Sequence, residues 1–440
     1  MNNPPVHLFP EKVYLSGADC FFLMLESNTL KHKIGNNVIR LSLLFENQKE
    51  AEVLVDQIQN SPFIHWLVNI ELIQGSFYQK PYWKYSDKVN KILINRTVCE
   101  VENELPRELL NREIPITSSS LIECDHVLYP SGKVAVVLSW HHILMDGRGS
   151  GLLMRHLSGQ IEYGNENFLD FFPKVEKKIS FLTYVRNMYK VKHFIQRSSK
   201  GPIASIASKR INDNTELSFG LRTICFDEHD TRLIDQYALQ NGARFGANNF
   251  LIAACAQTVH QVNLKRGTKG IIWIPIPYDG RKRGGRGPLV TNCISFLFYR
   301  LERTQLESIP LSIKAINEQM SDQIKMEMPK KYNLLLDMMR HIPIGLYRFL
   351  TTRSSKGAVS SFLFTSAGEG SWDMNELSEH SFSDILIIPP MTFPPGLTFS
   401  FLRVNNSLKM NIVYSDCCVN ADELSFMETK LRSILVENKL

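Results

Sequence analysis

Ten residues that follow a buried apolar run organise this chain: Ser139-Trp140-His141-His142-Ile143-Leu144-Met145-Asp146-Gly147-Arg148. The run before them, residues 134–138, is typical of a buried strand, and a helix is expected from Ser150 to Ile161. Two adjacent histidines therefore lie where a strand ends, and an Asp-Gly pair turns the backbone toward the helix. Histidines in this setting indicate a functional site.

Length and composition describe a globular chain of two parts. At 440 residues the chain is too long for one ordinary core, so we expect two domains or one large two-lobed unit. A hydrophobic content of 44% and a charged content of 21% are typical of a soluble globular protein. The net charge of +6 is mild, and we expect no nucleic-acid partner.

The sequence contains no recognisable membrane or export signal. The longest apolar runs, such as residues 271–277, have the length of a strand and not of a membrane-spanning helix. The first residues, Met1-Asn2-Asn3-Pro4-Pro5, lack the basic segment and apolar core of a secretion signal. We therefore expect a cytoplasmic protein without integral membrane association, and we expect a monomer.

Cysteines and basic residues each allow more than one interpretation. Eight cysteines are scattered through apolar stretches without a C-x-x-C pair, which favours buried thiols over disulfides or metal ligands. A basic segment contains Lys265, Arg266, Lys269, Arg281, Lys282, Arg283 and Arg286. This segment is either a solvated loop or a binding site for a phosphate-bearing donor.

The first half of the chain alternates strands with helices. Residues 16–26 favour a helix, and residues 38–45 favour a strand because apolar and polar side chains alternate. Asn47 is a suitable N-cap for a helix that Ser61-Pro62 ends. Residues 121–129 and 133–140 are typical of a hairpin, whose second strand leads into the histidines. Residues 66–96 suggest short strands and loops.

The second half has a similar order of elements. Strands are expected at 217–226, 271–277, 292–300, 358–365, 396–404 and 408–414, and helices at 227–240, 250–264, 309–327, 331–350 and 421–437. The small, polar stretch near residues 195–215 is the expected linker, which gives an N-terminal lobe over 1–200 and a C-terminal lobe over 215–440. The pattern predicts an α/β (α+β) protein of two related lobes.

The residue types in the spacing His-His-x-x-x-Asp-Gly each suggest a chemical role. A histidine at the end of a strand is a candidate general base, since its ordinary pKa is about 6.5. The aspartate could orient the ring or brace the turn against a cation, and glycine permits a bend that a side chain would forbid. Metal binding and simple core packing are the alternatives. Adjacent residues on a strand point to opposite faces, so His141 and His142 are poorly placed to chelate one ion, and we expect no metal site.

The stretch from His141 to Gly147 resembles the HHxxxDG signature of the superfamily of condensation domains and acyl-CoA-dependent acyltransferases. Other segments are similar to landmarks of that superfamily in the same order. They are residues 246–254, Pro275 to Arg281 (a P-x-D-x-R strand end with one extra residue), the glycine-asparagine segment 287–296 and the strand and turn at 362–368.

The resemblance implies a chloramphenicol acetyltransferase-like fold, in which two lobes, each a mixed sheet flanked by helices, enclose an active-site tunnel. His142 matches the catalytic base, and His141 matches a position that shapes the turn. Asp146 and Gly147 match structural positions, and Asp146 is expected to pair with Arg281 of the other lobe. Candidate oxyanion or substrate contacts are the Gly147 amide, Thr365 and Ser366, and candidate contacts to donor phosphates are Arg281, Lys282 and Arg283.

Some segments depart from the family patterns. The D-F-G-W-G string of the plant branch is absent, and Leu15-Ser16-Gly17-Ala18-Asp19 has Asp19 where condensation domains carry a glutamine. We therefore expect a stand-alone acyltransferase that forms an ester or amide without a covalent intermediate. Its donor would be acyl-CoA or a phosphopantetheinyl carrier protein, its acceptor a small molecule, and no cofactor would be tightly bound. The alternatives are a non-catalytic module that recruits carrier proteins and a lipid acyltransferase of the wax-ester type.

Overall fold

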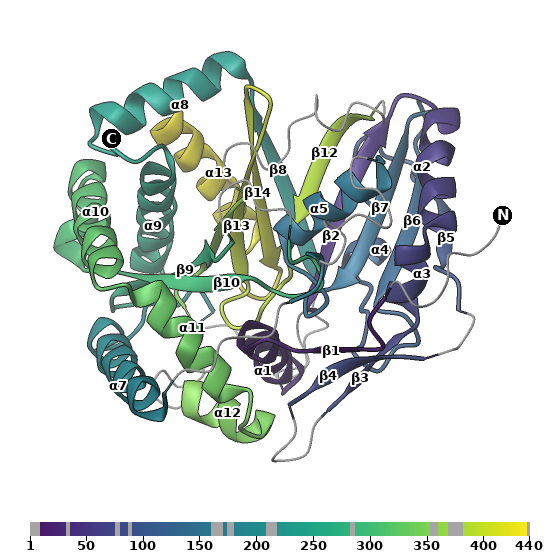
Figure 1. Ribbon diagram of the computed structural model, residues 1–440. Helices are drawn as coiled ribbons and strands as arrows, with labels where there is room; N and C mark the ends of the chain where they lie inside the picture. Colours follow the sequence, from purple (N-terminus) through teal and green to yellow (C-terminus); the bar gives the residue numbers. More distant parts are fainter. Residues whose placement is uncertain are drawn as a thin grey trace.

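The computed structural model describes residues 9–31, 36–74, 80–86, 90–159, 170–173, 180–207, 218–281, 287–352, 360–367 and 382–437. Two mixed sheets with helices packed against them form the two lobes of the molecule (Figure 1). The two-lobed α/β fold expected from the sequence is therefore confirmed.

The first lobe is built on a five-stranded sheet. Its strands in spatial order are β12 (Phe382–Ile388), β2 (Val38–Phe45), β7 (Val134–His141), β6 (Ile122–Leu128) and β5 (Ile94–Val98). All neighbours are antiparallel except β5 and β6. All eight residues of β7 are buried, because strands flank it on both sides and other elements cover its faces.

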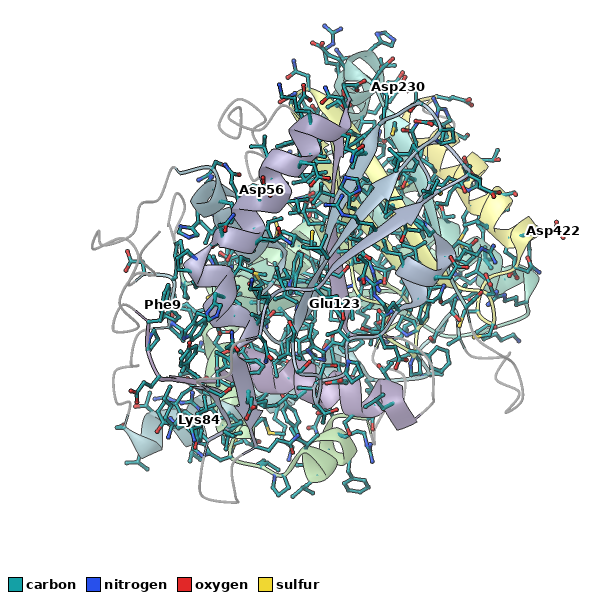
Figure 2. The ribbon with its side chains drawn as sticks, turned by 90° about the vertical axis from the view of Figure 1, so that its right-hand side faces the viewer. Phe9, Asp56, Lys84, Glu123, Asp230 and Asp422 are labelled. Atoms are coloured by element: carbon teal, nitrogen blue, oxygen red, sulfur yellow. The ribbon has the colours of Figure 1, made fainter. Side chains whose placement is uncertain are left out.

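Helices of the first lobe cover this sheet. They are α2 (Gln48–Asn60), α3 (Pro62–Val68), α4 (Arg107–Asn111) and α5 (Gly147–Leu157). Asn47 caps α2 by accepting a hydrogen bond from the Glu50 amide, and the helix buries the apolar stripe that its spacing predicts. Figure 2 shows α2, marked by Asp56, crossing in front of the strands near Glu123.

A small sheet and the first helix close the lower edge of this lobe. The sheet has the order β1 (Lys12–Tyr14), β4 (Tyr82–Tyr85) and β3 (Ile70–Ile73), and α1 (Gly17–Lys31) follows β1. Helix α1 packs closely on α11 (Met328–Met339), since a Cβ atom at Gly17 would lie 2.3 Å from the carbonyl carbon of Leu336. Glycine is therefore needed at this crossing.

The second lobe contains a four-stranded sheet and a two-stranded ribbon. The sheet has the order β11 (Leu363–Ser366), β13 (Leu397–Val404), β14 (Ser407–Ser415) and β8 (Phe219–Phe226), and the ribbon pairs β9 (Ile272–Asp279) with β10 (Ile294–Leu301). Around them lie α7 (Phe181–Ser198), α8 (Glu228–Gln240), α9 (Asn248–Lys265), the short helix η2 (Arg303–Leu306), α10 (Ile309–Lys325), α11, α12 (Ile344–Thr352) and α13 (Ala421–Leu435).

Strand β12 belongs to the second half of the sequence but to the sheet of the first lobe. It pairs antiparallel with β2, and Phe382, Ile385 and Ile387 join the hydrophobic core of that lobe. The sequence pattern indicated no strand at this position. The expected linker at 195–215 begins inside α7, and its residues 208–215 lie outside the described parts. The lobe boundary stays a prediction.

Several helices differ from the sequence-based expectation. The single helix expected over 331–350 is two helices, α11 and α12, and Pro343 lies in the break because proline cannot continue a helical ladder. Helix α7 was not expected, because its basic and aromatic sequence gave no simple apolar period. Helix α5 begins at Gly147, three residues earlier than expected.

Most of the cysteines lie in the interior of the protein. Of the eight cysteines, five are buried, two are half-buried and Cys225 is exposed. Within the described ranges, no helix combines the length and the apolar character that a bilayer crossing requires.

Candidate active site

Strand β7 positions the two histidines at the centre of the first lobe. Val38 of β2 pairs with His141 on one side, and the His141 amide donates to the Leu121 carbonyl on the other. The turn that follows is braced from within, since the Trp140 indole donates to the Met145 carbonyl at 2.9 Å. The turn therefore presents its side chains from a rigid base.

Asp146 joins this turn to the second lobe. Its Oδ1 accepts a hydrogen bond from the Gly149 amide at 2.8 Å and so caps helix α5, which is why the helix begins at Gly147. Its Oδ2 accepts from Arg281 Nη1 and from the Cys293 amide, both at 2.9 Å. One carboxylate thus holds the start of α5 and both ends of the loop between β9 and β10.

Arg281 is enclosed by the same loop, and its side chain is only 1% exposed. Its Nε and Nη2 donate to the Pro288 carbonyl at 3.1 and 2.9 Å. Burial lowers the pKa of Arg281, but the attraction and hydrogen bond of Asp146, together with the nearby Cys293 and Asp279, raise it above its ordinary value. The guanidinium is engaged inside the protein but also lines the chamber, and its contact with donor phosphates stays a prediction. Lys282 and Arg283 lie outside the described residues.

His142 is fixed through its main chain and its ring. Its amide donates to the Asn37 carbonyl at 2.7 Å, and its carbonyl accepts from Asn292 Nδ2 at 2.9 Å. The ring stacks on Phe22 of α1, with 3.7 Å between the ring centroids. Burial lowers the pKa of His142 to about 4, which leaves the imidazole neutral near pH 7. A neutral imidazole is the form that can accept a proton.

His141 turns to other partners. Its Nδ1 accepts from the Ile143 amide at 3.3 Å, and its Nε2 lies 3.1 Å from Glu26 Oε1 on α1. The two histidines therefore do not converge on one point. In the described residues, no group of three or more His, Cys, Asp or Glu side chains is placed to hold a metal ion.

Asp19, which the sequence analysis noted only as a departure from the family pattern, is buried and supports the turn from α1. Asp19 Oδ1 accepts from the amide and the side chain of Asn292 at 2.7 and 2.8 Å. Its Oδ2 accepts from the Ser16 amide and from Thr291 Oγ1, both at 2.7 Å. Burial raises the pKa of Asp19, and these hydrogen bonds oppose the rise. Asp19 therefore orients Asn292, which in turn holds the His142 carbonyl.

The position that leaves little room for a side chain is Gly149, inside α5, and not Gly147. A Cβ atom at Gly147 would meet no atom within 4 Å, and its backbone angle φ is not positive. A Cβ atom at Gly149 would lie 3.0 Å from both the Leu289 carbonyl oxygen and the Met145 Cβ. The close approach between α5 and the opposite loop therefore occurs at Gly149.

His142 lines a chamber of about 1850 Å³ to which both lobes contribute. Gly147 and Arg148 of α5 line it from the first lobe, and Thr365 and Ser366 of β11 line it from the second. Its lining includes the aromatic side chains of Phe22, Trp273, Phe296, Phe298, Tyr332 and Tyr347. Among its charged lining residues, Arg148 donates to Asp279 across the lobes, and Lys192 comes from α7.

The fold of this chain is similar to that of known proteins, although its sequence is not. No protein-family model matches the chain, and no curated protein matches it. Solved structures do match over nearly the whole length. The first condensation domain of the calcium-dependent antibiotic synthetase is 14% identical with a TM-score of 0.65, and the alignment covers 97% of this chain and 96% of that one.

Two acyltransferases show a similar likeness. Trichothecene 15-O-acetyltransferase from Fusarium sporotrichioides is 12% identical with a TM-score of 0.64, and 98% of this chain and 96% of that one are covered. The wax ester synthase/diacylglycerol acyltransferase from Marinobacter aquaeolei VT8 is 14% identical with a TM-score of 0.58, and 97% and 100% are covered. The chain therefore has the two-lobed fold that condensation domains share with these acyltransferases.

Proposed function

We propose that this chain is an acyltransferase that moves an acyl group from a thioester donor to a hydroxyl or amine of a small acceptor. The observation that carries the proposal is His142, a buried and neutral imidazole in the wall of a chamber that both lobes line. Two structures with the same fold, an acetyltransferase and a wax ester synthase/diacylglycerol acyltransferase, support the reaction class.

The proposed reaction is direct transfer. Neutral His142 accepts the proton of the acceptor hydroxyl or amine while the acceptor oxygen or nitrogen forms a bond to the thioester carbonyl carbon. The tetrahedral intermediate then collapses, the carbon–sulfur bond breaks, and the thiolate takes the proton back from the imidazolium. Burial of the ring favours its neutral form, so each cycle ends with the base restored.

The oxyanion of the intermediate needs hydrogen-bond donors. The Gly147 amide stands at the N-terminus of α5, where backbone N–H groups and the helix dipole favour negative charge. Thr365 and Ser366 carry hydroxyls on the other wall of the chamber. These three groups are the proposed oxyanion or substrate contacts.

The donor remains acyl-CoA or an acyl carrier protein, since both carry phosphate on the pantetheine arm. Arg148 and Lys192 line the chamber and are proposed to meet donor phosphates, together with Lys282 and Arg283 of the basic segment. The proposal includes no tightly bound cofactor, and a monomeric state and a cytoplasmic location stay predictions.

A second candidate is a lipid acyltransferase of the wax-ester type. The aromatic wall of the chamber favours it, because such a surface suits a long apolar chain better than a polar acceptor. A non-catalytic module that recruits carrier proteins is the remaining alternative, and the neutral, enclosed His142 argues against it.

The test follows thiol release from acetyl-, decanoyl- and aromatic acyl-CoA, with small alcohols, amines and long-chain alcohols as acceptors. We expect acceptor-dependent release that His142→Ala lowers by about two to four orders of magnitude with the fold retained. His229→Ala, on the exposed surface of α8, is the matched control and should keep full activity. Release that His142→Ala leaves near normal would remove His142 as the base. No release from any donor would favour the non-catalytic module.

A further inference from the structure

Helix α7 exposes large apolar side chains on its outer face. Leu182 is 81% exposed and Tyr189 is 69% exposed, and Val185 is also exposed. Positions 182, 185 and 189 recur at helical spacing and share one side of the helix. The opposite side is the packed one, because Val191 is fully buried and forms a cluster with residues of β10 and α11. The outer apolar residues are therefore not part of the core.

The same helix is basic along its whole length. Arg186, Lys190, Lys192 and Arg197 are exposed on it, and the segment Phe181–Ser198 contains no aspartate or glutamate. An exposed helix of a soluble domain usually mixes both signs of charge. A face that combines bases with exposed Leu, Val and Tyr is instead typical of a helix that lies in the interface of a membrane.

Helix α12 adds a second exposed apolar surface. Leu346, Phe349 and Leu350 are each about half exposed, and the segment Ile344–Thr352 has no acidic residue. Helices α7 and α12 lie along the same lower edge of the molecule, with α11 between them (Figure 1). We call the outer surfaces of these two helices the α7/α12 face.

The chamber reaches this edge of the molecule. Met188, Lys192 and Ile195 of α7 line it, and so do Leu350 and Thr351 of α12. A surface on which the α7/α12 face rests would therefore lie close to the chamber wall.

We propose that the α7/α12 face docks on an anionic lipid bilayer. Its Leu, Val, Tyr and Phe side chains would enter the boundary between headgroups and acyl chains, and its bases would bind lipid phosphates. Binding is peripheral, consistent with the lack of a bilayer-crossing helix in the described residues. Because the apolar side chains are spread over two separate helices, they fit the fluid surface of a bilayer better than the fixed surface of one acidic protein. The inference concerns an interaction surface and does not rest on the proposed reaction.

Vesicle flotation of the full-length protein tests the proposal. We expect the protein to float with vesicles of phosphatidylcholine and phosphatidylglycerol, and to bind vesicles of phosphatidylcholine alone much more weakly. High salt should weaken the binding, because it screens the charge component. No flotation with the anionic vesicles would overturn the proposal.

Variants locate the surface. Arg186→Glu/Lys190→Glu should lower the vesicle partition coefficient by more than about tenfold, since each base near an anionic surface contributes on the order of 1 kcal/mol. Leu182→Ser/Tyr189→Ser and Leu346→Ser should weaken binding at every salt concentration. None of these side chains lines the chamber, and circular dichroism checks the fold of each variant.

Matched controls carry the same changes elsewhere. Leu239→Ser on α8 and Lys314→Glu on α10 alter exposed residues outside the face and should bind like the wild type. His142→Ala should also float normally, so a failed reaction would leave this result intact. Wild-type flotation by the α7 variants would refute the assignment of the face. If the protein instead ignores vesicles and binds an acidic carrier protein through Arg186 and Lys190, the face is a protein-docking site and the proposal is wrong.

Discussion

Replacing Asp146 with asparagine removes one charge from the contact that joins the two lobes. The carboxylate accepts hydrogen bonds from the Gly149 amide at 2.8 Å and from Arg281 and the Cys293 amide at 2.9 Å. Asparagine has the same shape and caps helices as well as aspartate, so the start of α5 should survive. Its NH₂ group, however, would face two other hydrogen-bond donors, Arg281 Nη1 and the Cys293 amide.

The expected loss follows from the burial of the partner. Arg281 is 1% exposed, and its raised pKa keeps it charged at neutral pH. Without that carboxylate, the buried cation keeps only Asp279, whose Oδ1 lies 3.4 Å from Arg281 Nη1 and whose side chain is 33% exposed. The cost should therefore fall near the lower end of the about 3–5 kcal/mol that breaking a buried pair from one side costs. We therefore expect Asp146→Asn to lower the free energy of unfolding by about that amount.

Urea unfolding followed by tryptophan fluorescence measures this change, and a double-mutant cycle isolates the pair. Arg281→Met alone should be destabilising, but Asp146→Asn/Arg281→Met should be more stable than the sum of the single effects predicts, because the unpaired charge is gone. Turnover per folded molecule should change little in each variant. If Asp146→Asn unfolds like the wild type, the pair does not stabilise the lobe contact. If that variant is stable but inactive, Asp146 acts in the chemistry.

The remaining predictions concern the histidine, its support and the glycine. Since the pKa of His142 is lowered to about 4, kcat/KM should stay level from neutral pH downward and fall only as pH approaches that value, and an acid limb near pH 6.5 would contradict a buried base. His142 binds its proton near pH 6.5 in the unfolded chain but only near pH 4 in the folded protein. As pH falls from about 6.5 to about 4, the free energy of unfolding of the wild type should therefore decrease relative to that of His142→Gln. Asn292→Ala should lower the free energy of unfolding by about 1–3 kcal/mol, because Asp19 loses a buried hydrogen bond. It should also lower kcat more than it changes KM, and wild-type kinetics would show that the His142 carbonyl needs no support. Gly149→Ala should lower the free energy of unfolding by about 1–3 kcal/mol, because the new Cβ crowds Leu289. Gly147→Ala, which has open space at its Cβ, should leave the thermal unfolding temperature nearly unchanged.

Much of the fold could be predicted because neighbouring residues decide it. The apolar run at 134–138 predicts β7, and Asn47 and the stripe after it predict α2. The helix expected over 227–240 corresponds to α8. The expected pairing partners Asp146 and Arg281 do lie in hydrogen-bond contact. Strand β12 and helix α7 were missed, since a strand is specified by its place beside β2 and a half-exposed basic helix has no clear apolar period.

The sequence alone determined the local order of the site: a strand that ends at two histidines, a turn with an Asp-Gly pair and a helix behind it. These follow from contacts a few residues apart, where backbone geometry and hydrogen-bonding side chains leave few choices. Only the tertiary structure decided how the turn is held, because Arg281 lies 135 positions from Asp146, Asn292 lies 150 from His142, and Asp19 lies 273 from Asn292. Burial of those contacts, which only packing of the two lobes creates, is also what lowers the pKa of His142 and locks Arg281 away from solvent.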